Sequence, residues 1–172
     1  MKGLKPRKPG IVFVARFFAA LIVLYLVISA PPVNEHAIVP LTRAIVSATA
    51  LLLRVLREPI AVAGTVISTA HFALEVRNGC NAVEAMMILA AAVVAFPATL
   101  RSRLTGLVAA SVAIQLVNLI RVTSLVWLGE HYRAAFDVVH VAVWQTLVIA
   151  CAVAMFILWS WKFAERPAQA RR

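Results

Sequence analysis

A cysteine lies in a short polar segment just before an apolar run. Asn78-Gly79 is a turn signal, and the apolar run begins directly after Asn81. Cys80 is therefore expected near a helix N-terminus, where free backbone N–H groups and the helix dipole favour thiolate over thiol. The same N–H groups can stabilise an oxyanion. This placement suits a nucleophile, although a lone cysteine also fits a small residue at a membrane–water boundary.

Two polar neighbours of the cysteine are possible supporting residues. Asn81 is an alternative cap of the helix, because asparagine is favoured at that position. Glu84 lies about one turn further on and can cap the helix or orient a partner. Its negative charge would work against a thiolate on Cys80.

An arginine lies inside a later apolar run. Arg121 is about seven residues from the expected outer end of that run, roughly 10 Å deep at 1.5 Å per residue. A cation at this depth is costly unless it faces protein or water, so it indicates a functional site. Asn118, one turn away, can hydrogen-bond in the same cavity. The alternative is that Arg121 extends its side chain to the outer interface.

A histidine begins the last apolar run, again at the expected outer end. His140 can act as a general acid or base, and its imidazolium form can stabilise a thiolate. On its own it also fits a polar residue at the membrane interface. Cys80, Arg121 and His140 together would supply the nucleophile, cation and base that a thioester-forming step needs.

The elements that must position these residues are membrane helices. Of the 172 residues, 63% are hydrophobic and 14% charged, whereas a soluble domain is about half apolar and a quarter charged. We predict one all-α polytopic membrane domain, 1–172, because four apolar runs approach the length that spans about 30 Å of hydrocarbon. These runs are 11–29, 82–100, 105–128 and 139–161. The first is interpreted as a retained anchor rather than a cleaved signal.

Two further segments do not fit a simple membrane span. Residues 37–56 carry Arg43 and Arg54, which share one helical face, and predict an amphipathic helix at the interface. Residues 66–76 alternate with period two, with Val66, Ser68, Ala70, Phe72, Leu74 and Val76 on one side. They predict a short extended element, one half of a hairpin with 60–63, that must lie above the hydrocarbon or be covered.

The net charge of +10 is concentrated beside the apolar runs. Basic residues gather in the tails 1–10 and 162–172 and in the connection 101–104, which predicts that these parts are cytoplasmic. This orientation explains the charge better than nucleic-acid binding does. It requires that 37–56 does not cross, and it places Cys80, Arg121 and His140 in the outer half of the membrane.

The order of these motifs resembles the exosortase/archaeosortase family of membrane transpeptidases, most closely the compact exosortase H type. The residues that carry the resemblance are Asn78-Gly79-Cys80-Asn81-Ala82, Asn118-Leu119-Ile120-Arg121 and His140. Many family members have Ser-Gly or Thr-Gly after the cysteine, where this chain has Asn-Ala.

The resemblance implies a role for each site residue. Cys80 would be the nucleophile, Arg121 would stabilise the oxyanion or position the scissile carbonyl, and His140 would be the general acid/base. The substrate would be an exported protein with a C-terminal motif, transmembrane helix and basic cluster. A cell-envelope acceptor would take the product, and no metal or other cofactor is implied. The enzyme would lie among the lipids of a bacterial inner membrane, with its site on the periplasmic side.

Two other functions remain open from the sequence. The same residues could serve a cysteine protease that releases its product to water. A non-enzymatic membrane subunit or small transporter could use Arg121 to bind a charged partner.

Overall fold

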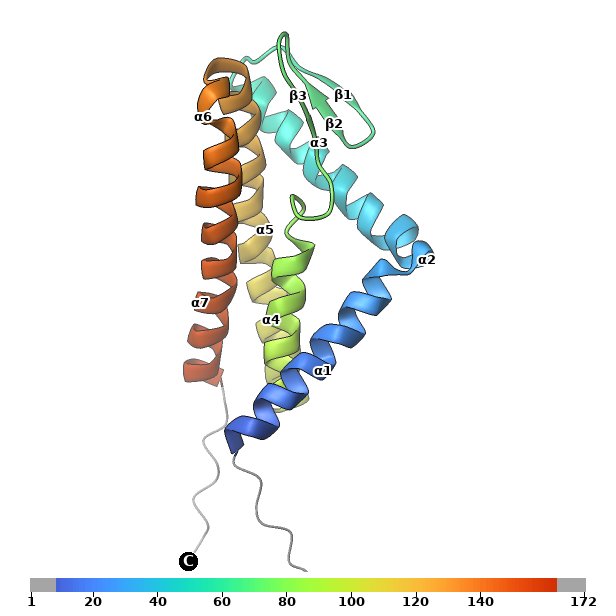
Figure 1. Cartoon of the computed structure of the whole chain (residues 1–172), viewed down its shortest axis with the longest axis vertical. Helices are drawn as coiled ribbons and strands as arrows, with labels where there is room; N and C mark the ends of the chain where they lie inside the picture. Colours follow the sequence, from blue (N-terminus) through green and yellow to red (C-terminus); the bar gives the residue numbers. More distant parts are fainter. Residues whose placement is uncertain (1–8, 164–172) are drawn as a thin grey trace, which may run out of the picture.

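The computed structural model describes residues 9–163, so the predicted basic tails 1–10 and 162–172 lie almost entirely outside the described residues. Helices dominate, with one small sheet between the third and fourth α-helices (Figure 1). The elements are α1 (Pro9–Ser29), α2 (Pro31–Val33), the π-helix η1 (Asn34–Ile38), α3 (Val39–Val55), β1 (Ala61–Ala63), β2 (Val66–Ser68), β3 (Ala73–Glu75), α4 (Val83–Ala95), α5 (Leu100–His131), α6 (Arg133–Val138), the π-helix η2 (Val139–Trp144) and α7 (Gln145–Phe163).

Helix α4 is the short member of the bundle. It has 13 residues, about 20 Å, and ends at Ala95 because Phe96 is extended ahead of Pro97. In Figure 1 it runs from below the sheet to the end of the molecule where α1 begins and α7 finishes. α1 packs against it.

Helix α5 runs the length of the described bundle, and α6, η2 and α7 follow one another beside it (Figure 1). α5 has 32 residues, about 48 Å, and its first turn is capped by Thr99, whose side chain accepts a hydrogen bond from the Ser102 amide. At the same end, the indole nitrogen of Trp159 donates to the Ser102 carbonyl over 3.0 Å. This bond joins the start of α5 to the last turns of α7.

Four helices among the described residues are long and apolar enough to cross a membrane. They are Gly10–Ser29, Pro31–Val55, Leu100–His131 and Arg133–Lys162. The predicted fold class, a helical polytopic membrane protein with a small extended element before the cysteine, is confirmed. By length alone α3 with its preceding turns qualifies and α4 falls short, so the assignment of 37–56 as an interfacial helix and 82–100 as a span stays a prediction.

The extended element is a three-stranded antiparallel sheet in the order β1-β2-β3. Strands β1 and β2 form the predicted hairpin through a two-residue turn that begins with Gly64, at φ +63°. The extended element predicted over 66–76 is present, but its period-two alternation is interrupted, because a tight turn after Ser68 separates β2 from β3. The turn changes the phase, so Ile67 faces the core with Leu74, its partner across the ladder.

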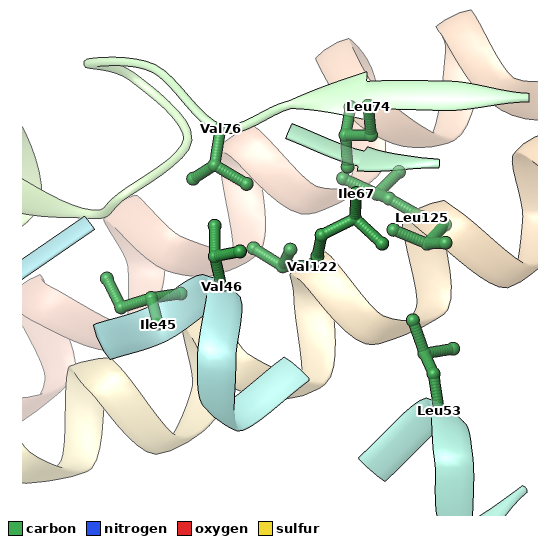
Figure 2. Close-up of a cluster of buried hydrophobic side chains, with 9 residues drawn as sticks. Ile45, Val46, Leu53, Ile67, Leu74, Val76, Val122 and Leu125 are labelled. Carbon is green, nitrogen blue, oxygen red and sulfur yellow. The ribbon is translucent and has the colours of Figure 1, made fainter. Parts of the chain in front are cut away.

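The sheet is held on the bundle by an apolar cluster. Figure 2 shows side chains from the sheet pointing toward those of α3 and α5, and the buried members are Ile45, Val46, Leu53, Ile67, Leu74, Val76, Val122, Leu125 and Val126. Arg43 and Arg54 lie on the other face of α3 and are exposed, as their spacing predicts. The cluster therefore covers one face of the sheet with side chains of α3 and α5.

A close approach of helix and sheet predicts the effect of one substitution. A Cβ added at Gly129 would clash with the ring of Phe72, which packs against Phe136 with ring centroids 5.0 Å apart. We expect Gly129→Ala to lower the free energy of unfolding by about 1–3 kcal/mol, seen as a lower thermal midpoint in detergent. Gly10→Ala meets no atom of the described residues within 4 Å and is the matched control. Equal midpoints would contradict this packing.

Candidate active site

The cysteine lies in a turn whose shape depends on two left-handed residues. Gly79 has φ +90° and Ala82 has φ +59°. Between them the Cys80 amide donates to the Arg77 carbonyl over 2.9 Å. Ala82 occupies the cap position of α4, and the side-chain oxygen of Asn81 accepts from the Val83 amide over 3.2 Å. Cys80 is thus two residues before the cap, and Asn81 satisfies one of the N–H groups predicted to face the thiolate.

Asn81 also fixes the turn to two other helices. Its side chain is fully buried, and its amide nitrogen donates to Thr42 Oγ1 over 3.1 Å and to Asn78 Oδ1 over 3.0 Å. The Asn81 carbonyl accepts from Gln115 Nε2 over 3.0 Å. Because α3 and α5 both bond to this residue, the turn that carries Cys80 is anchored on two sides.

The cysteine and the histidine are in contact. Cys80 Sγ lies 3.2 Å from His140 Nε2, and both side chains are half-buried. The His140 ring packs against Phe136, with ring centroids 5.4 Å apart. In the neutral tautomer with hydrogen on Nδ1, Nε2 accepts the thiol proton. The pair can therefore work as a nucleophile and its base.

The arginine lies behind the turn and is buried. Arg121 is 2% exposed, so it does not extend to the interface. Its Nη1 donates to the Gly79 carbonyl over 3.2 Å and its Nη2 to Gln145 Oε1 over 3.3 Å. Arg121 therefore contacts the turn that carries Cys80, at the residue directly before the cysteine.

Burial controls the charge state of the cysteine. It raises the pKa of the Cys80 thiol above its ordinary value. The charge of Arg121 and a hydrogen bond from the Arg77 backbone oppose the rise, and the charge of Glu84 adds to it. The expected low-pKa thiolate at a helix N-terminus is therefore replaced by a thiol hydrogen-bonded to His140. The Cys80 thiol therefore loses its proton to His140, and the helix dipole alone does not make it a thiolate.

The supporting residues are placed differently from one another. Glu84, Arg121 and Gln145 line a small cavity of about 40 Å³ beneath the cysteine turn. Asn118 is fully buried, but neither side-chain atom has a hydrogen-bond partner among the described residues. Glu84 is therefore part of the site's surroundings, while Asn118 is buried on α5, does not line this cavity and lacks the predicted hydrogen bond.

Other polar groups at this end of the molecule pair away from the site. His71 Nδ1 lies 2.8 Å from Glu130 Oε1, and His131 Nε2 lies 3.7 Å from Glu58 Oε1. Arg77 forms an ion pair with Glu75. Of the described histidines, His140 is the one in contact with Cys80.

Residues 10–160 match the family model described as transmembrane exosortase (Exosortase_EpsH), and this match includes every residue of the site. The chain belongs to the transmembrane exosortase family. No curated protein and no solved structure matches the exosortase chain significantly. The family resemblance predicted from the motifs is confirmed. The family comprises membrane cysteine transpeptidases and proteases that process exported proteins with C-terminal signals.

Two residues that support the exosortase site were not predicted from the sequence. Gln145 was passed over, although a polar side chain within an apolar run is itself a signal. Its separation of five residues from His140 hid it, because an α-helix would put the two about 140° apart. Thr42, buried on α3 and bonded to Asn81, gave no signal in the sequence.

The charge state of the exosortase cysteine can be measured by alkylation. The thiolate is the reactive form, so a raised pKa moves the rise in alkylation rate to higher pH. In full-length Cys151→Ala protein in detergent, we expect the midpoint for Cys80 above the value of about 8.5 for a free cysteine. Adding Arg121→Leu removes an opposing charge and should raise the midpoint further. A midpoint below neutrality would contradict the burial described above.

Proposed function

We propose that this exosortase is a cysteine transpeptidase that cleaves the C-terminal sorting tail of exported proteins and transfers them to a cell-envelope acceptor. The observation that carries the proposal is the 3.2 Å contact between Cys80 Sγ and His140 Nε2, next to the buried Arg121. A nucleophile in contact with a base, together with a fixed cation, is the arrangement that acyl transfer needs.

In the first step, the Cys80 thiol gives its proton to His140 Nε2 while the sulfur attacks the scissile carbonyl. A C–S bond forms and the carbonyl oxygen becomes an oxyanion. When this intermediate collapses, the C–N bond breaks and the imidazolium gives its proton to the leaving amine. The products are a thioester on Cys80 and the released tail.

Arg121 stabilises the charge that develops in this step. Its guanidinium is held by the Gly79 carbonyl, one residue from the nucleophile, and is shielded from water. A cation in such a place costs little reorganisation when the oxyanion forms. The same charge favours the thiolate of Cys80 as its proton moves to His140.

In the second step, a nucleophilic group of the acceptor attacks the thioester. His140 takes the proton of that nucleophile, the new bond to the carbonyl carbon forms, and Cys80 leaves as thiolate and recovers its proton. If water attacks instead, the same residues perform proteolysis. The two reactions differ only in the nucleophile that reaches the thioester.

The proposed location is a bacterial inner membrane with the site on the periplasmic side. α1 begins, α5 begins and α7 ends at one end of the molecule (Figure 1), where Arg101 and Arg103 also lie. Arg121 is 21 residues along α5 from Leu100, about 32 Å at 1.5 Å per residue. If the basic end is cytoplasmic, this length brings the site to the opposite interface.

This orientation predicts which cysteine reacts from outside. A membrane-impermeant maleimide added to intact cells or spheroplasts should label Cys80 and spare Cys151, because Cys151 lies within α7 among apolar residues. The Cys80→Ala variant supplies the unlabelled control. Labelling of Cys80 only after permeabilisation would reverse the orientation.

The proposed activity predicts a strict need for the cysteine. Cys80→Ala should abolish cleavage of a protein that carries a C-terminal motif, transmembrane helix and basic cluster, followed by immunoblotting for the uncleaved precursor. Cys151→Ala is the matched control and should process normally. Full processing in Cys80→Ala would exclude both enzymatic functions and leave the non-enzymatic membrane subunit or transporter.

The fate of the product separates transfer from hydrolysis. Mass spectrometry of the processed protein should find its new C-terminus joined to an acceptor group. A free carboxylate on most molecules would instead assign a protease.

A further inference from the structure

His140 and Gln145 are five residues apart, and the helix between them is not an α-helix. Residues Val139–Trp144 form the π-helix η2, in which hydrogen bonds join residues i and i+5. In an α-helix, five residues would place the two side chains about 140° apart around the axis. With the π-turn, both reach the same site: His140 contacts Cys80 and Gln145 contacts Arg121.

The contact with Gln145 matters because Arg121 has few partners. Within residues 9–163, its hydrogen bonds are to the Gly79 carbonyl and to Gln145 Oε1, and its Nε has none. Gln145 is therefore the one side chain in this part of the chain that orients the guanidinium. A buried charge without partners is expensive, so the loss of either bond would let Arg121 move.

The position of Gln145 is costly for any purpose other than such a contact. It is exposed, and its neighbours Val143 and Leu147 are exposed and apolar, as expected on a membrane-facing helix. A side-chain amide that faces lipid loses its hydrogen bonds to water, and this loss is costly unless protein groups replace them. Arg121 provides that replacement through the 3.3 Å bond to its Nη2.

We propose that Gln145 is a positioning residue that holds the Arg121 guanidinium beside Cys80, and that η2 sets its place one turn below His140. Its part in catalysis rests on the proposed transpeptidase function. A glutamine serves this purpose better than a carboxylate, because a neutral acceptor orients the arginine and leaves its positive charge to act on the cysteine and the oxyanion.

The test follows the reactivity of Cys80 rather than the stability of the fold. The charged and titratable groups that face this thiol are His140, Arg121 and Glu84. The backbone amide of Cys80 donates to the Arg77 carbonyl. If Gln145 holds Arg121 in place, its loss weakens the effect of that charge on the thiolate. In full-length Cys151→Ala protein, we expect Gln145→Leu to move the alkylation midpoint of Cys80 up by about half a pH unit, or about a threefold slower reaction below the midpoint.

Two further variants show whether the effect passes through Arg121. Gln145→Leu added to Arg121→Leu should shift the midpoint no more than Arg121→Leu alone, because residues that act as a unit are not additive. Thr146→Leu is the matched control: Thr146 is the next residue, exposed and polar, and should leave the midpoint unchanged. An unchanged midpoint in Gln145→Leu, or fully additive shifts in the double variant, would overturn the proposal.

Processing of a tailed substrate completes the test. Gln145→Leu should slow cleavage by about 10- to 100-fold, because a small displacement of a catalytic group costs that much, while Thr146→Leu cleaves normally. Alkylation does not use the substrate, so the two hypotheses fail separately. A shifted midpoint with no cleavage even by the unaltered protein contradicts the transpeptidase function alone. Normal cleavage by Gln145→Leu contradicts the positioning role.

Discussion

The burial of the Arg121 guanidinium constrains how the rest of the site is arranged. Arg121 is 2% exposed within an apolar bundle, where an unpaired charge is costly. Its two hydrogen bonds bring together the turn before α4 and the start of α7, which are 66 residues apart in the chain, from Gly79 to Gln145. The cysteine lies on the first of these segments and the histidine just before the second. The same bonds that satisfy the arginine therefore bring the nucleophile to its base.

A second set of contacts keeps the cysteine turn from moving with the loops above it. Asn81 is bonded to α3 through Thr42 and to α5 through Gln115. The sheet, in turn, is tied to the end of α5, where Thr69 donates to Glu130 Oε2 over 2.6 Å. A nucleophile in a loop thus has the rigid surroundings normally found on helices, as an organised acyl-transfer site requires.

Much of this arrangement was predictable from the sequence, and the reasons for the rest are specific. Apolar runs and basic flanks predict the helical membrane fold, because the bilayer imposes length and composition. The sequence singles out Cys80, Arg121 and His140 because each is costly or reactive where it lies, and the structure brings them together. Gln145 was hidden by a π-turn, since sequence reasoning assumed 3.6 residues per turn. The thiol pKa was misjudged because the burial of Cys80 depends on packing that no local pattern reports.

The short length of α4 has a consequence for which peptide bonds can reach the cysteine. Its 13 residues cover about 20 Å, while the hydrocarbon core of a bilayer is about 30 Å thick. If α4 crosses the membrane as predicted, the height of the cysteine turn is set by this helix and not by a flexible loop. On the proposed function, a peptide bond is cut only if its own membrane anchor presents it at that height. Selection among exported proteins would then depend on the distance between cleavage point and anchor, as well as on the residues around the bond.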